Sequence, residues 1–158
     1  MTAMPQMVAL FNGMGAGAAA AIGAEELFRG QPVPGGHALV TILGSLIGSV
    51  SLSGSLIAWA KLDSRMKKTW RIRGQQVLNG FIMLIVLLVG GYIAFLRRGN
   101  AGAPVTSAFF IGALLFGVLM TVPIGGADMP VEISLYNAFT GLAVGAEGFV
   151  LQNPALMI

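Results

Sequence analysis

The chain contains no cysteine and a single histidine, His37, among its 158 residues. The lack of cysteine excludes disulfides, cysteine-ligated zinc, iron–sulfur clusters and thiol nucleophiles together. One histidine leaves little for a histidine metal site or a catalytic triad. We therefore predict neither a metal site nor a catalytic residue in this chain.

Charged residues are also scarce, at 9% of the chain against about 25% in a water-soluble domain. Hydrophobic residues make up 56% of the chain, and the mean hydropathy is +0.83. A chain with so few charges cannot cover itself in water, so its natural solvent is a lipid bilayer. The 23 glycines are about twice the usual number, which suits membrane helices that pack closely.

Five apolar stretches approach or exceed the roughly 20 helical residues that cross a hydrocarbon core about 30 Å thick. They cover residues 5–28, 37–62, 74–96, 104–127 and 130–153. The connections between them are polar or rich in glycine and proline, and none has room for a soluble domain. The sequence predicts an all-α membrane protein, a bundle of about five transmembrane helices that forms a single domain over residues 1–158.

Positive charge is concentrated in one connection, residues 61–73, which holds six of the nine lysines and arginines. Short cytoplasmic loops carry such an excess, so we expect this loop, and with it the N-terminus, on the cytoplasmic side. The membrane topology also explains the isoelectric point of about 9.8 without a nucleic-acid partner. The six residues are Lys61, Arg65, Lys67, Lys68, Arg71 and Arg73.

An internal repeat places two asparagines at equivalent depths. Residues 4–23 and 129–148 agree at seven of twenty positions, and Asn12 and Asn137 each lie seven residues after a proline that opens a helix. Each amide is therefore about 10 Å from the start of its helix. Ser55 precedes Lys61 by six residues, about 9 Å along the antiparallel second helix. We expect Asn12, Ser55 and Asn137 to form one polar cluster inside the bundle.

Two interpretations of this cluster stay open. Unpaired amides are costly in hydrocarbon, so the side chains either hold helices together or line a path for ions or protons. Glycine pairs at i and i+4 predict close approach of neighbouring helix backbones. These pairs are Gly13 and Gly17, Gly44 and Gly48, and Gly141 and Gly145.

Acidic residues occur at both ends of the fifth stretch. Glu147 lies ten residues beyond Asn137, about 15 Å further along the helix and rotated by about 80°. It could carry a proton, reach the outer interface, or pair with Arg97 or Arg98. Asp128 precedes this helix, where the helix dipole favours a carboxylate.

Three segments resemble the membrane domain of the beta subunit of proton-translocating nicotinamide nucleotide transhydrogenases. They are MPQMVALFNGMGAGAAA, VSLSGSLIAWAKL and, most specifically, IGGADMPVEISLYNAFTGLAVGAEGFVL. The resemblance is detailed over the first, second and fifth stretches. It rests on hydropathy and order over the third and fourth.

The resemblance implies part of an inner (plasma) membrane oxidoreductase and translocase that couples hydride transfer between NADH and NADP to proton translocation. Asn12, Ser55 and Asn137 match positions along the family's proton path. Asp128 matches an acidic residue at the cytoplasmic mouth, where the NADP(H) domain is coupled. The implied partners are membrane helices of an alpha subunit, soluble NAD(H)- and NADP(H)-binding domains, and a second complex in a homodimer.

The sequence departs from the family pattern at two positions. The family often has histidine where this chain has Asn12, and asparagine cannot take up and release a proton near neutral pH. The titrating group is then Glu147, where the family usually has a small residue, or a histidine on another subunit. We favour the histidine because Glu147 is distant in depth.

The resemblance also implies that the chain is a part of the family's subunit, without its nucleotide-binding domain. We therefore expect the chain to bind no cofactor and to transfer no hydride by itself. The alternative function is a small secondary transporter or ion-channel subunit built on the internal repeat.

Overall fold

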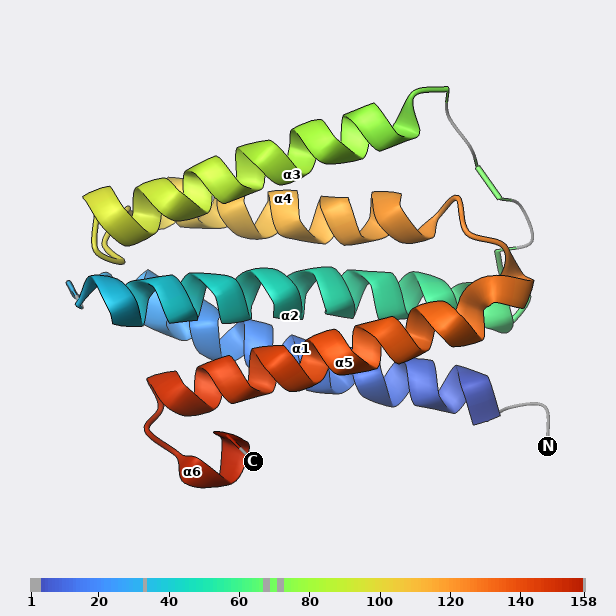
Figure 1. Ribbon diagram of the computed structural model, residues 1–158, viewed down its shortest axis with the longest axis horizontal. Coiled ribbons are helices and arrows are strands. Elements are labelled where there is room, and N and C mark those ends of the chain that lie inside the picture. Colours follow the sequence, from blue (N-terminus) through green and yellow to red (C-terminus); the bar gives the residue numbers. More distant parts are fainter. Residues whose placement is uncertain (1–3, 33, 67–68, 71–72, 158) are drawn as a thin grey trace.

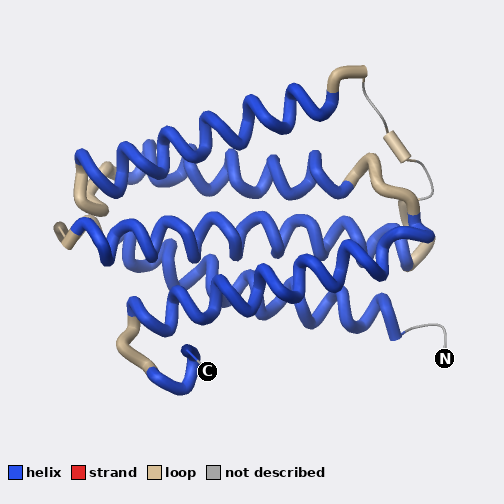
Figure 2. Tube along the Cα trace, viewed as in Figure 1, coloured by secondary structure: helices blue, strands red, loops and turns tan. Residues whose placement is uncertain are grey.

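The computed structural model describes residues 4–32, 34–66, 69–70 and 73–157, and its regular elements are all helical (Figure 1 and Figure 2). Lys67, Lys68 and Arg71 of the predicted basic loop lie outside the described residues. The elements are α1 (Met4–Arg29), α2 (Gly35–Leu62), α3 (Gln75–Gly91), the π-helix η1 (Tyr92–Leu96), α4 (Ala103–Thr121), the 3₁₀-helix η2 (Gly126–Asp128), α5 (Met129–Val150) and α6 (Pro154–Met157).

Helix α2 is the centre of the bundle. It packs against α1, α4 and α5, and α3 covers the far side of α4 (Figure 1). The five long helices alternate in direction, so the start of α1, the end of α2 and the start of α5 share one end of the molecule (Figure 1). This arrangement confirms the expected all-α bundle. It also buries most of α2 between the other helices.

Within the described ranges, four helical segments are long and apolar enough to cross a membrane: α1, α2, α3 continued by η1, and α4. Helix α5 has 22 residues and lies lengthwise beside α1 and α2. It is less apolar because it contains Asn137 and Glu147. Large apolar side chains cover the outside of the bundle, as expected for a surface in contact with lipid. Examples are Phe11, Met14, Phe81, Leu88, Ile111 and Leu142.

Two helix ends differ from the predicted boundaries by more than two residues. Helix α4 ends at Thr121 instead of residue 127, because Pro123 and the following glycines do not continue a helix. Helix α5 ends at Val150 instead of residue 153. Asn153 precedes Pro154, and a residue before proline is disfavoured in the helical conformation.

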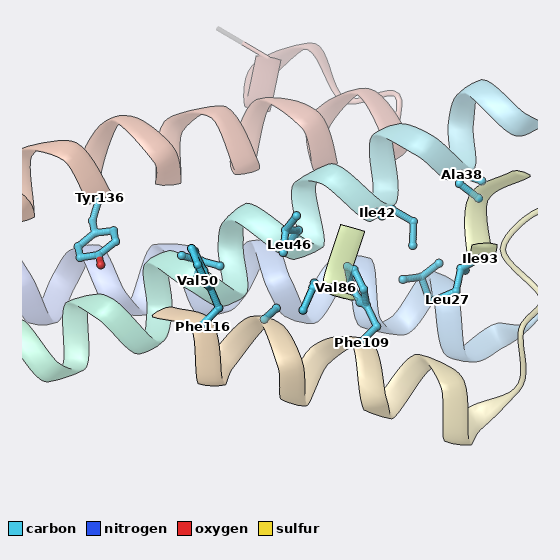
Figure 3. Packing of buried hydrophobic residues seen from close by; sticks show 12 residues of the cluster. Leu27, Ala38, Ile42, Leu46, Val50, Val86, Ile93, Phe109, Phe116 and Tyr136 are labelled. Atoms are coloured by element: carbon cyan, nitrogen blue, oxygen red, sulfur yellow. The ribbon is translucent and has the colours of Figure 1, made fainter. Parts of the chain in front are cut away.

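Two different interfaces meet on α2. The one that faces α3 and α4, here called the apolar seam, is filled by large side chains (Figure 3). The one shared with α1 and α5, here called the polar seam, contains small and polar side chains. The apolar seam includes Ile42, Leu46, Val50, Val86, Phe109 and Phe116. The polar seam includes Asn12, Ala16, Gly23, Gly48, Ser51, Ser55, Thr140 and Glu147.

Glycines bring the helix backbones together in the polar seam. A Cβ atom on Gly48 would lie 3.0 Å from the carbonyl oxygen of Ala16, and one on Gly13 would lie 3.4 Å from Ser55 Cβ. Two of the three predicted glycine pairs therefore lie at helix contacts. The third does not, since Cβ atoms on Gly141 and Gly145 would meet nothing within 4 Å.

Lys61 links the end of α2 to the end of α4. Its Nζ donates hydrogen bonds to the carbonyl oxygens of Thr121 at 2.9 Å, Val122 at 2.5 Å and Ile124 at 2.6 Å. The side chain is only 7% exposed. These carbonyls have no partner within α4, and a cation at a helix C-terminus is favoured by the dipole. The lysine therefore closes the end of the bundle.

We expect Lys61→Met to lower the free energy of unfolding of the protein by about 2 kcal/mol, because three carbonyls lose a charged donor. Thermal denaturation in detergent micelles measures the change. Arg65→Met is the matched control, since Arg65 is exposed and contacts Asp63 and the ring of Trp59 rather than the end of α4. Equal melting temperatures for the two variants would contradict this role of Lys61.

Candidate functional site

The amide of Asn12 lies in the polar seam, 7% exposed, and points at the serines of α2. Its Nδ2 donates a hydrogen bond to Ser55 Oγ at 2.8 Å and lies 3.4 Å from Ser51 Oγ. Gly13 allows this approach because it has no side chain toward Ser55. The predicted contact between Asn12 and Ser55, inferred from their depths, is present.

Ser51 continues the chain of hydrogen bonds into α5. Its Oγ donates to the carbonyl oxygen of Tyr136 at 3.0 Å and lies 2.7 Å from Thr140 Oγ1, which itself lies 2.9 Å from the same carbonyl. Either hydroxyl can donate to the carbonyl while the other donates to its neighbour. Because a hydroxyl is both donor and acceptor, the pair has two possible hydrogen-bond orders. In one, Ser51 donates to the carbonyl and Thr140 donates to Ser51; in the other, the two hydroxyls exchange these roles.

Tyr136 extends the same polar region to α4. Its ring is fully buried, and its hydroxyl lies 2.6 Å from Thr121 Oγ1, which donates to the carbonyl of Gly117 at 2.8 Å. Gly54 makes room for the ring, since a Cβ atom there would lie 2.6 Å from Cε2 and from the hydroxyl of Tyr136. Here we name the polar network as the set that joins four helices: Asn12, Ser51, Ser55, Thr121, Tyr136 and Thr140.

One acceptor in this network has no partner among the described residues. Asn12 Oδ1 is buried and accepts no hydrogen bond. Buried polar atoms are normally paired with protein or water, so this oxygen is where a water molecule would bind. Amides and hydroxyls can orient water and pass hydrogen bonds along, although none of them takes up a proton near neutral pH.

Asn137 does not join the network, and the prediction that it would is wrong. Its side chain is exposed on the outer face of α5, together with Ser134 and Gly141. The face of α5 that turns inward carries Tyr136, Thr140, Ala143 and Glu147, which follow the spacing i, i+4, i+7, i+11. The repeat placed the two asparagines at matching depths, but burial of the large tyrosine ring sets the rotation of α5.

Glu147 lies in the polar seam, fully buried, with no hydrogen bond to either carboxylate oxygen among the described residues. Two of its three predicted roles are therefore wrong: the side chain neither reaches the interface nor pairs with Arg97 or Arg98. Arg97 instead donates to the hydroxyl of Tyr92 at 2.8 Å.

Asp128 is exposed at the junction of η2 and α5, at the end of the bundle where α2 also ends. A surface pocket beside it is lined by Thr69, Pro123, Ile124 and Gly125 as well as Asp128 itself. The acidic group is thus accessible from outside the bundle.

Sequence reasoning missed Thr121, Tyr136 and Thr140. Hydroxyl side chains in helices often bond to the carbonyl four residues earlier, as Thr121 and Thr140 both do here. Such residues give no sequence signal for a partner on another helix. The spacing of Tyr136, Thr140 and Glu147 along one face of α5 is the signal that could have revealed the inward face.

Comparison with known proteins bears on the whole chain. Residues 1–158 match the family model described as NAD(P) transhydrogenase beta subunit. The chain belongs to this family. Two curated sequences from Rhodospirillum rubrum, one of them from strain ATCC 11170, are named NAD(P) transhydrogenase subunit beta. Each is 34% identical over 169 aligned residues that cover all of this chain and 35% of the relative.

The chain therefore spans about a third of the length of these transhydrogenase subunits. Four of its described helices are long and apolar enough to cross a membrane, which together with the family makes it a multi-pass membrane protein. The polar network lies inside this membrane protein. Among the described residues, no group of three or more metal-binding side chains occurs.

We expect Gly54→Ala to disrupt the network by overpacking, because the new methyl group would occupy the position of the Tyr136 ring. Overpacking of this kind costs about 1–3 kcal/mol. The melting temperature of the complex in detergent measures the effect. Gly80→Ala is the control, since a Cβ atom at Gly80 meets nothing within 4 Å. A Gly54→Ala complex as stable as the control would show that the ring is not confined there.

Proposed function

We propose that the chain is the proton-conducting membrane part of a transhydrogenase, coupling proton translocation to hydride transfer between NADH and NADP. The observation that carries this proposal is the polar network buried across four helices of an otherwise apolar bundle. The match to the transhydrogenase beta subunit family supports it and favours it over the alternative of a small transporter or channel subunit.

The network is more extensive than helix association requires. A single interhelical hydrogen bond contributes only about 0.6 kcal/mol on average, whereas a polar group left unpaired in an apolar setting costs several kcal/mol. Asn12 nevertheless keeps a buried oxygen that has no hydrogen-bond partner among the residues that the structure describes. A site that binds a water molecule between Asn12 and the serines of α2 gives that oxygen its donor and gives the network a transferable proton.

The hydroxyl pair of Ser51 and Thr140 suits proton conduction for a second reason. Its two hydrogen-bond orders share the Tyr136 carbonyl as acceptor, so a change of direction needs only rotation of the two hydroxyl groups. When a proton is passed to one hydroxyl and the other hydroxyl releases its own proton, the pair is left in the opposite order. Both hydroxyl groups must then rotate back before the next proton can pass in the same direction.

Coupling is proposed at the end of the bundle where Asp128 lies. Asp128 is exposed there, close to the end of α2 and to the start of the basic loop. The soluble NADP(H)-binding domain would contact this end, while NAD(H) binds a second soluble domain. Protonation in the bundle changes the affinity for NADP(H) only if the two protonation states contact that domain differently.

Asn137 is proposed to act at a boundary between subunits. It is exposed on α5 beside Ser134 and Gly141, two small residues that let another helix approach closely. An asparagine on a membrane surface requires a polar partner. Membrane helices of the alpha subunit would supply that partner. The complex would be a homodimer in the inner membrane, with the N-terminus of this chain on the cytoplasmic side.

The proposal is tested on the complete complex in sealed vesicles, with nucleotide reduction and internal pH followed together. We expect Asn12→Leu to reduce both rates by about tenfold, because it removes the donor to Ser55 and costs about 1–2 kcal/mol in the path. Ser53→Ala is the control on α2, since Ser53 donates to the carbonyls of Ser49 and Val50 in its own helix. Unchanged rates in an assembled Asn12→Leu complex would refute the proposal.

Asn137→Leu tests the boundary role in the same assay. We expect both rates to fall on the order of tenfold while the complex stays assembled, because a hydrogen bond across subunits is lost. Leu135→Ala changes a neighbouring exposed residue and serves as the control. If Asn137→Leu impairs only assembly, Asn137 holds subunits together and lies outside the path.

A further inference from the structure

A second polar site lies in the polar seam, around Glu147. The carboxyl group is 0% exposed, and neither of its oxygens has a hydrogen-bond partner among the described residues. Glu147 follows Thr140 by seven residues on the same inward face of α5, so the two side chains are about 10 Å apart along the helix. The polar network does not include this group.

The surrounding helices leave space for the carboxyl group. A Cβ atom on Gly44 would lie 2.5 Å from Glu147 Oε1, and one on Gly23 would lie 2.7 Å from the same oxygen. The Gly23 position also contacts Ser45 Oγ, a fully buried hydroxyl for which the described part of the chain provides no hydrogen-bond partner. Two glycines on two helices thus form a recess that holds one carboxyl group beside one serine hydroxyl.

No described cation neutralises Glu147. On α1 the charged group nearest to the recess is Glu26, three residues beyond Gly23, and on α2 it is His37, whose Nε2 lies 3.9 Å from Glu26 Oε1. Glu25 and Arg29 pair with each other on the exposed side of α1. Helices α4 and α6 contain no charged residue, and α5 adds only Glu132 near its start.

A buried carboxylate without a cationic partner is too costly to stay charged unless it binds something. A metal ion requires several oxygen or nitrogen ligands, and no group of three acidic or histidine side chains occurs among the described residues. A single proton removes the charge of the group without any further ligand. We propose that Glu147 is a proton-binding site in the outer half of the polar seam.

The position of Glu147 suggests how protons reach it. Glu26 and His37 are about one quarter exposed and lie at the end of the bundle where α1 finishes and α2 begins. Toward the polar network the seam is lined by small residues, Ala16, Gly48 and Ala143. Glu147 therefore supplies a titrating group, which Asn12 cannot provide. This role rests on the proposed proton-conducting function.

Proton binding is tested by chemical labelling of the assembled complex in its membrane. Dicyclohexylcarbodiimide reacts with protonated carboxyl groups in apolar surroundings, and mass spectrometry of peptides locates the adduct. We expect labelling at Glu147 that declines as the pH is raised and that Glu147→Gln abolishes. Glu132→Gln is the matched control and should leave it unchanged. Gly44→Ala should reduce it, because the methyl group would fill the recess.

Several results would overturn the proposal. They are an unlabelled Glu147 in an assembled complex, labelling independent of pH, or labelling suppressed by sodium at constant pH, which would indicate a cation site. Proton uptake by vesicles with Glu147→Gln is the functional measurement, and a rate equal to wild type would also overturn it. If the wild-type complex reduces nucleotide without moving protons, the proposed function fails, while the labelling result still decides whether Glu147 binds a proton.

Discussion

The structure depends on the cost of leaving a polar group unpaired where water is absent. Helix α2 brings Ser51, Ser53 and Ser55 into the middle of a membrane bundle, and each of them has a partner on another helix or within its own. Ser53 solves the problem locally, by bonding to carbonyls one turn earlier. Ser51 and Ser55 solve it across helices, and their partners determine how α1 and α5 sit against α2.

This constraint explains the contrast between the two seams. Large side chains in the apolar seam gain from dispersion and need no directional contact. The polar seam has to bring donors and acceptors within about 3 Å of one another, which is possible only where helix backbones come close. Gly48 and Gly54 allow that approach, because a Cβ atom at Gly48 would press on the backbone of α1 and one at Gly54 would overlap the ring of Tyr136.

Much of this arrangement could be predicted from the sequence because membranes simplify the problem. Hydropathy located the five long helices, and a fixed rise per residue located Asn12 opposite Ser55. Depth, however, does not determine rotation about a helix axis. For α5 the rotation follows from the burial of Tyr136 against Gly54, which involves two residues 82 positions apart, and this is why Asn137 was assigned to the wrong face. The sequence predicts Lys61 as part of the basic loop. Nothing in the neighbouring sequence predicts its hydrogen bonds to the end of α4.

The attachment of Lys61 to the end of α4 also has a mechanical consequence. The lysine ties α2 and α4 together at one end, and the large side chains of the apolar seam hold them along their length. Helices α2 and α4 are therefore held together as one unit. Helices α1 and α5 contact this pair through small residues and hydroxyl groups. A displacement of α1 or α5 along α2 would therefore have to break the hydrogen bonds of Ser55 to Asn12 or of Ser51 to the Tyr136 carbonyl.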